Sequence, residues 1–293
     1  MRVGTMTSLF RERRESDEYI GYPEAVRRCA EAGFEVLDMN LCALPRRRTT
    51  LHHDDWKQQV DVIRNEAEKV GLPFVQSHPP YRTGRDGRSF ATPEDEQFFD
   101  KMLLRSIEIS AMLGCKWAVM HPVTAIGAED GDTEASIRYN KQLFADAIEL
   151  ADKLNVGLAF ENMCDTMSRR RFCCTAQELA ALVDSFHSDK IGACWDVGHA
   201  HRFYDDQVPA ILLMGERIKA LHIDDNIGDT DQHRLPFTGT LPWEQVMHAL
   251  HEGGCKADMI FEITTTHRMP AALQDTTARY CCEVGRYLVS LYK

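Results

Sequence analysis

Short apolar runs alternate with longer amphipathic stretches along the whole chain. A strand buried on both faces reads as a nearly continuous apolar run, whereas a helix that covers a sheet repeats its apolar residues every three or four positions. The apolar runs therefore predict eight strands, at Arg2–Thr7, Phe34–Asn40, Phe74–His78, Lys116–His121, Val156–Glu161, Ile191–Asp196, Ile218–Ile223 and Met259–Ile263.

The amphipathic stretches predict one helix after each strand. The clearest start is at Thr92, an N-cap residue followed by Pro93 and by acidic residues in the first turn. The predicted helices are Tyr22–Ala32, Asp54–Val70, Pro93–Leu113, Thr133–Leu154, Ala176–Phe186, Val208–Arg217, Pro242–His251 and Ala271–Leu291.

Eight strand–helix units follow one another without a linker or a change of composition. Strands that alternate with helices pair in parallel, and eight such units predict a closed (β/α)8 TIM barrel. We therefore expect an α/β protein with a single domain over residues 1–293. A doubly wound open sheet is the alternative, because periodicity alone does not show closure.

Composition and charge narrow the class of protein. The chain is 44% apolar and 27% charged, with a formal net charge of −11, which argues against a general binder of nucleic acid or anionic membranes. Its ten cysteines are scattered without a C-x-x-C pair, and no apolar segment has the length of a signal peptide or a membrane span. We expect a cytoplasmic protein without nucleic-acid or membrane partners.

Metal-binding residue types recur where the predicted strands end. In a parallel barrel these positions meet at the C-terminal face, where active sites of this fold lie. Histidine and carboxylate are ligands of borderline and hard divalent ions, and a carboxylate beside apolar neighbours is costly to bury without a cation or partner. The pattern predicts a metal site among His78, His121, Glu161, Asp196, His199, His222, Asp231, His233 and Glu262.

Seven motifs over the last six predicted strands carry a family resemblance. They are SHPPY (77–81), MHP (120–122), FEN (160–162), WDVGHAH (195–201), LHIDDN (221–226), DQHRLPFTG (231–239) and FEIT (261–264). As a set they resemble the xylose isomerase-like TIM barrel superfamily. This group contains the sugar phosphate isomerases/epimerases and also the endonuclease IV type of apurinic-site nuclease.

The epimerase branch of this superfamily implies one divalent ion, Mn, Co, Mg or Zn. By position, its ligands are Glu161, Asp196, His222 and Glu262. The resemblance implies that Glu161 and Glu262 also move the carbon-bound proton of a sugar, through an enediolate. Dimers and tetramers are common in the superfamily, so a homo-oligomer is compatible with it.

The nuclease branch implies two or three zinc ions and uses the same positions together with five more. Those five are occupied by His78, His121, His199, Asp231 and His233. The residues Arg234, Pro236, Gly239 and Trp243 resemble the isomerase ending of the seventh strand's loop, although Phe237 stands where a glycine is usual. We favour the isomerase, in which the five residues and Arg234 bind substrate or an additional metal.

Arginines are concentrated in the loops that follow the predicted strands, whereas lysines lie on helices or near strand starts. Arginine's planar fork suits carboxylate and phosphate, which favours an anionic carbohydrate such as a sugar phosphate or sugar acid. The plain alternative is that solvated loops tolerate any charge. The arginines are Arg11, Arg13, Arg14, Arg46–Arg48, Arg82, Arg85, Arg88, Arg169–Arg171, Arg202, Arg234 and Arg268.

Overall fold

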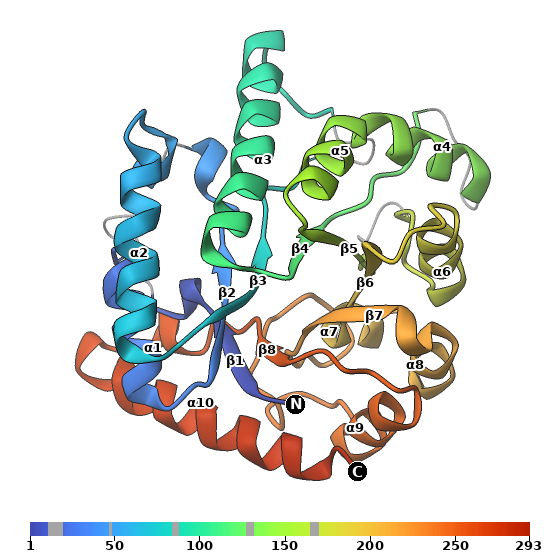
Figure 1. The fold of residues 1–293 in the computed structure, drawn as a ribbon. Coiled ribbons are helices and arrows are strands. Elements are labelled where there is room, and N and C mark those ends of the chain that lie inside the picture. The colour runs from blue at the N-terminus through green and yellow to red at the C-terminus, as the bar shows by residue number, and fades with distance from the viewer. Residues whose placement is uncertain (11–19, 47–48, 84–87, 127–131, 165–169) are drawn as a thin grey trace.

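Eight parallel strands form the centre of the protein in a computed structural model that describes residues 1–10, 20–46, 49–83, 88–126, 132–164 and 170–293 (Figure 1). Neighbouring strands follow one another in the chain, in the order β7-β6-β5-β4-β3-β2-β1-β8. The strands are β1 Val3–Met6, β2 Val36–Asn40, β3 Phe74–His78, β4 Trp117–Met120, β5 Gly157–Glu161, β6 Ile191–Asp196, β7 Ile218–His222 and β8 Met259–Phe261.

The sheet closes on itself between β7 and β8. A parallel bridge joins Ile223 to Phe261 just past the end of β7. The Ile223 N–H donates to the Ile260 carbonyl at 2.8 Å, and the Glu262 N–H donates to the Ile223 carbonyl at 3.2 Å. The predicted (β/α)8 barrel is therefore confirmed, and the open doubly wound sheet is wrong.

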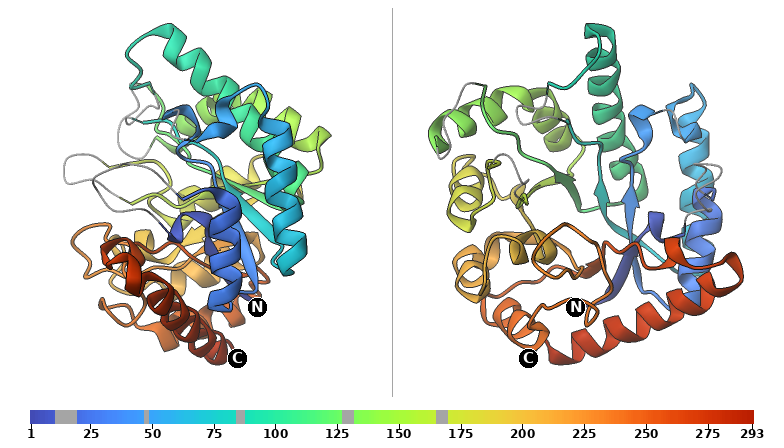
Figure 2. Two further views of the ribbon diagram at one scale, coloured as in Figure 1. Left: turned by 90° about the vertical axis from the view of Figure 1, so that its left-hand side faces the viewer. Right: turned by 180° about the vertical axis from the view of Figure 1, so that it is seen from behind.

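Helices surround the strands on the outside of the barrel (Figures 1 and 2). None of those described is long and apolar enough to cross a membrane. The helices are α1 Tyr22–Ala32, α2 Trp56–Val70, α3 Pro93–Leu113, α4 Thr133–Leu143, α5 Ala145–Lys153, α6 Ala176–Asp184, α7 Val197–His201, α8 Val208–Met214, α9 Trp243–Glu252 and α10 Ala271–Leu291, with 3-10 turns at Thr7–Leu9, Leu44–Arg46, Thr50–His52, Gly215–Arg217 and Thr266–Arg268.

The helices depart most from the sequence prediction at two places, and some ends differ as well: α6 ends at Asp184 instead of Phe186, and α8 at Met214 instead of Arg217. The predicted helix Thr133–Leu154 is interrupted at Phe144, whose buried ring packs against Phe160 of β5 with centroids 6.1 Å apart. A short helix, α7, follows β6 directly, because the Asp196 side chain accepts the His199 N–H at 2.6 Å and caps it. Apolar periodicity does not reveal a helix of this length.

Small side chains fill the barrel interior below the strand ends. Val119, Ala159, Cys194 and Ala220 form one buried cluster. Alternate residues of a strand face the same side, so the residue two positions after each of the last three lies directly above this apolar layer. Those residues are Glu161, Asp196 and His222, and they therefore lie at the mouth of the barrel.

Candidate metal centre and active site

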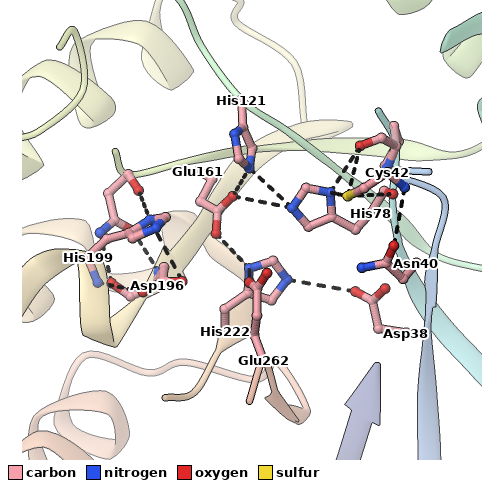
Figure 3. Close-up of polar contacts among 12 residues, drawn as sticks. Asp38, Asn40, Cys42, His78, His121, Glu161, Asp196, His199, His222 and Glu262 are labelled. Atoms are coloured by element: carbon pink, nitrogen blue, oxygen red, sulfur yellow. Dashed lines mark hydrogen bonds and ion pairs between the residues drawn. The ribbon is translucent and has the colours of Figure 1, made fainter. Parts of the chain in front are cut away.

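Four strand-borne side chains converge at the mouth of the barrel. His78, Glu161, His222 and Glu262, which we call the inner cluster, offer ligand atoms that all lie within 4.8 Å of one another (Figure 3). The His222 Nδ1 atom lies 2.6 Å from Glu161 Oε1 and 2.9 Å from Glu262 Oε2. Three of the four residues that the resemblance implies as ligands therefore meet at one point.

Asp196, the fourth implied ligand, lies beside this point. It groups with Glu161 and His199 within the same 4.8 Å limit, and the strand register pairs it with His222. Its Oδ1 caps α7, whereas Oδ2 is buried and has no hydrogen-bond partner among the described residues. The Asn162 side chain fixes the backbone here: its Oδ1 accepts the Asp196 N–H at 2.7 Å and its Nδ2 donates to the Asp196 carbonyl at 2.8 Å.

His121 contacts the inner cluster from β4's end. Its Nε2 lies 2.6 Å from Glu161 Oε2 and 3.1 Å from the His78 Nε2. The ring of Tyr81 stacks on His121 with centroids 4.6 Å apart. Both predicted histidines from the third and fourth strands thus reach Glu161, and the tyrosine of the SHPPY motif covers one of them.

A second group of side chains, which we call the outer cluster, lies on α7 and in the loop after β7. It consists of His199, Asp224, Asp231 and His233. Asp231 Oδ2 is 3.4 Å from His199 Nε2 and 3.2 Å from His233 Nε2, and Asp224 Oδ2 is 2.6 Å from His233 Nδ1. The Asp-x-His pair of the seventh loop is therefore brought to the histidine of α7, as the sequence predicts.

The loop after β7 is held by a buried carboxylate. Asp225 accepts five hydrogen bonds of 2.9–3.3 Å: four from backbone N–H groups of its own loop and one from the indole of Trp243. Phe237, one of the four amide donors, has a φ of 70°, in the left-handed region that glycine adopts without strain. The loop therefore keeps a glycine-type conformation without the glycine.

The neighbouring charges shift the pKa values of the inner cluster strongly. Burial by itself raises the pKa of Glu161, but His222 and His121 outweigh it and hold the pKa well below the ordinary value. Burial also raises the pKa of Glu262, but the charge of His222 outweighs it and lowers this pKa to about 2. Burial lowers the pKa of His222, yet Glu262 and Glu161 raise it well above its usual range.

The donor set fits a divalent metal ion. Burial, together with the charge of Asp224, raises the pKa of Asp196 well above the ordinary value, so ionisation of this carboxyl in the metal-free protein is costly. A divalent cation near Asp196 Oδ2 supplies the missing partner and balances the carboxylates of Glu161 and Glu262. Oxygen donors with one imidazole suit Mn, Mg or Co, whereas the histidines around them suit Zn.

A cavity of about 430 Å³ opens over both clusters. Six predicted site residues line it, namely His78, His121, His199, Asp231, His233 and Glu262. The other lining residues include Ser8, Asn40, Cys42, Arg46, Tyr81, Cys164, Arg171, Thr264 and His267.

Some of the loop arginines expected from the sequence line the cavity, and others bind elsewhere. Arg46 and Arg171 line the cavity. Arg82 instead donates to Glu96 at 2.7 Å and to Asp100, both on α3, and Arg234 Nη1 donates to the Thr238 carbonyl at 2.9 Å. Neither is among the cavity-lining residues. Seven predicted loop arginines lie outside the described residues: Arg11, Arg13, Arg14, Arg47, Arg48, Arg85 and Arg169.

Sequence reasoning missed the contribution of β2 and the residues just after it. Cys42 Sγ lies 3.1 Å from the His78 Nδ1, and Asp38 Oδ2 lies 3.7 Å from the His222 Nε2 (Figure 3). The available signal was polar residues at alternate positions, Asp38 and Asn40, in an otherwise apolar run. Alternation places both on the face that looks into the barrel.

Comparisons with known proteins agree with this architecture. The sequence profile described as "Xylose isomerase-like TIM barrel" matches residues 26–281. The crystal structure of a D-tagatose 3-epimerase-like protein covers 100% of this chain and 98% of its own, with a TM-score of 0.74 and 16% identity. D-psicose 3-epimerase from Clostridium cellulolyticum H10 covers 99% of both chains, with a TM-score of 0.73 and 15% identity. These likenesses establish the fold.

A relative by sequence has a different described activity. A probable endonuclease 4 from Shouchella clausii (strain KSM-K16) is 27% identical over 188 residues, covering 58% of this chain and 60% of the relative. The chain spans about three fifths of the length of the first curated relatives that it matches.

Proposed function

The chain belongs to the xylose isomerase-like TIM barrel family, and we propose that it is a divalent-metal-dependent isomerase or epimerase of a small anionic sugar. The observation that carries the proposal is the convergence of Glu161 and Glu262 on the His222 Nδ1 atom, at 2.6 and 2.9 Å. The buried carboxylate of Glu161 on β5 and the partly exposed carboxylate of Glu262, just after β8, thereby face one point at the floor of a sugar-sized cavity. The similarity of the fold to D-psicose 3-epimerase and to a D-tagatose 3-epimerase-like protein supports the same reaction class.

The proposed metal ligands are Glu161, Asp196, His222 and Glu262. When bound, a divalent ion polarises a sugar carbonyl and its neighbouring hydroxyl. Asp196 is suited to this role because Oδ2 is buried and accepts no hydrogen bond from the described residues. The bond from the His199 N–H to Oδ1 holds the carboxylate, and Asn162 holds the backbone.

Glu161 and Glu262 are the proposed proton-transfer groups. Both pKa values are lowered, so both side chains are carboxylates at neutral pH and each is ready to accept a proton. One takes the carbon-bound proton of the sugar, which leaves an enediolate, and the other takes up a proton from solvent and donates it to a carbon of that intermediate. The first then releases its proton to solvent, so that both groups return to the carboxylate form. A positioned acid or base of this kind contributes roughly 10²–10⁴-fold to the rate.

The anionic part of the substrate is assigned to the arginines that line the cavity. Arg46 and Arg171 line it, together with His267. Guanidinium groups bind carboxylate and phosphate oxygens through paired N–H donors. Among the described residues, these two are the arginines expected from the sequence that line the cavity.

The test is exchange of carbon-bound hydrogen with solvent deuterium. The protein is first freed of metal with a chelator, and half of it is reloaded with Mn²⁺. Both samples are then incubated in D2O with sugar phosphates, sugar acids and neutral sugars. We expect deuterium incorporation only with metal, and faster with anionic sugars. Arg171→Gln should raise KM for the anionic sugar about tenfold, whereas Arg138→Gln, the same change on exposed α4, should not. Metal-independent exchange, or no exchange with any sugar, contradicts the proposal.

A second candidate function is a zinc-dependent apurinic-site endonuclease. It is favoured by the outer cluster, in which Asp231 lies between His199 and His233, and by the endonuclease 4 relative. Metal analysis separates the two candidates. Two or three zinc ions per chain with cleavage of an abasic duplex support the nuclease, and one ion with deuterium exchange supports the isomerase.

A further inference from the structure

Asp38 is a buried carboxylate that the proposed chemistry does not use. It lies on β2 and is fully buried. In Figure 3 it faces the side of the His222 ring that points away from Glu161 and Glu262. Its register partner on β1 is Met6, so an apolar side chain borders it on that strand. A carboxylate in such surroundings is costly unless a donor or cation meets it.

Each of the two side chains, Asp38 and His222, has one buried polar atom that lacks a hydrogen-bond partner among the described residues. These atoms are Asp38 Oδ1 and His222 Nε2. Asp38 Oδ2 is 3.7 Å from His222 Nε2, within reach of a small side-chain adjustment. Gln76 Nε2 donates to this Oδ2 at 2.8 Å and reaches the Leu221 carbonyl at 3.5 Å, which ties the carboxylate to the residue preceding His222.

The plane of the His222 ring is already set by packing. The His78 ring stacks on it with centroids 5.4 Å apart and an interplanar angle of 6°. What packing does not set is which nitrogen carries the proton in the neutral imidazole. A proton on Nδ1 blocks the lone pair that faces Glu161 and Glu262, whereas a proton on Nε2 leaves that lone pair available.

We infer that Asp38 is a positioning residue that accepts the Nε2–H of His222 and thereby turns the Nδ1 lone pair toward the metal position between Glu161 and Glu262. This inference rests on the proposed metal centre. The Asp38 carboxylate also increases the basicity of the imidazole, because its negative charge stabilises positive charge on the ring. Removing a carboxylate that orients a metal-binding histidine typically weakens metal binding about 10–100-fold.

The experiment compares the wild-type protein with Asp38→Asn, which keeps the size of the side chain and removes its charge. Zn²⁺ binding to the chelated proteins is measured by calorimetry, and thermal melts establish that both are folded. The matched control is Asp100→Asn, the same change in the Arg82 pair on α3. We expect Asp38→Asn to weaken Zn²⁺ binding about 10–100-fold and Asp100→Asn to leave it unchanged.

A spectroscopic readout requires no variant. In the Zn²⁺-loaded wild type labelled with ¹⁵N-histidine, long-range ¹H–¹⁵N spectra should show the His222 proton on Nε2. A proton on Nδ1, or equal Zn²⁺ affinity in folded Asp38→Asn, overturns the inference and leaves the metal centre standing. Failure of the wild type to bind Zn²⁺ overturns both. If Asp38→Asn does not fold, the spectrum of the wild type decides.

Discussion

The inner and outer clusters contain the same residue types on different kinds of backbone. The residues of the inner cluster lie on strands or immediately after one, and neighbouring strands hold that backbone on both sides. In the outer cluster, His199 lies on the short α7, and the other members follow β7 in its loop. Exposure separates the clusters less sharply than backbone does. The His222 and Glu161 side chains are 0% exposed and that of Glu262 is 21% exposed, whereas His233 and Asp231 are 24% and 29% exposed and Asp224 is 0% exposed.

This difference suggests a division of labour within one cavity. Groups that must hold a metal and move a proton need positions fixed to a fraction of an ångström, which paired strands supply. Groups that meet the variable part of a substrate are suited to loops on a rigid scaffold. We therefore expect changes in the inner cluster to act mainly on kcat and changes in the outer cluster mainly on KM.

The largest expected effect comes from Glu161→Gln, which keeps the shape of the side chain and removes its charge. Loss of a proton-transfer group that also binds the metal should lower kcat about 10³-fold or more. His233→Gln, the matched change in the outer cluster, should cost about tenfold, chiefly in KM. Steady-state kinetics with the sugar found by deuterium exchange measures both, at equal metal content.

Equal damage from the two variants contradicts the division of labour. In that outcome the clusters act as one unit, because residues of a single catalytic group show strongly non-additive effects. Such a result also strengthens the nuclease alternative, in which the outer cluster holds a metal of its own.

The next effect concerns stability, because the outer cluster depends on a loop that Asp225 organises. Asp225→Ala leaves five donors without their acceptor inside a buried loop. We expect the free energy of unfolding to fall by about 3 kcal/mol. Asp229→Ala, the same substitution in the exposed part of this loop, should change it by less than about 0.5 kcal/mol. Urea denaturation measures both, and similar values for the two variants show that the loop is held by other contacts.

The inner cluster could be predicted from the sequence because its geometry follows from strand order. Once eight parallel strands are recognised, every strand end lies on one rim, and residues such as Glu161 and Glu262 must be near one another. The outer cluster was found from its Asp-x-His spacing and the resemblance. What the sequence could not show is that Asp224, rather than solvent, faces His233 Nδ1.

Sequence patterns could not predict which side chains of distant elements contact one another. The sequence predicts that Arg82 binds the substrate, but its guanidinium forms ion pairs with Glu96 and Asp100 of α3. The pattern places Asp38 in a strand, but alternating polar residues in an apolar run do not reveal which atom each of them faces. Both cases depend on how helices and neighbouring strands pack around the residue, which periodicity does not describe.

The smallest expected effect is a pH dependence of metal affinity, which arises because His222 and His121 differ in protonation. Glu262 and Glu161 raise the pKa of His222, so a metal ion that binds this imidazole must displace a proton; burial lowers the pKa of His121, which has none to displace near neutral pH. Metal affinity should therefore rise with pH, about tenfold per unit for each displaced proton, until the pH passes the pKa of His222. Zn²⁺ competition titrations between pH 6 and 8, corrected for the chelator, measure this slope. An affinity that does not change over this range implies that His222 is already neutral in the metal-free protein, and that the carboxylates facing it are compensated by another group.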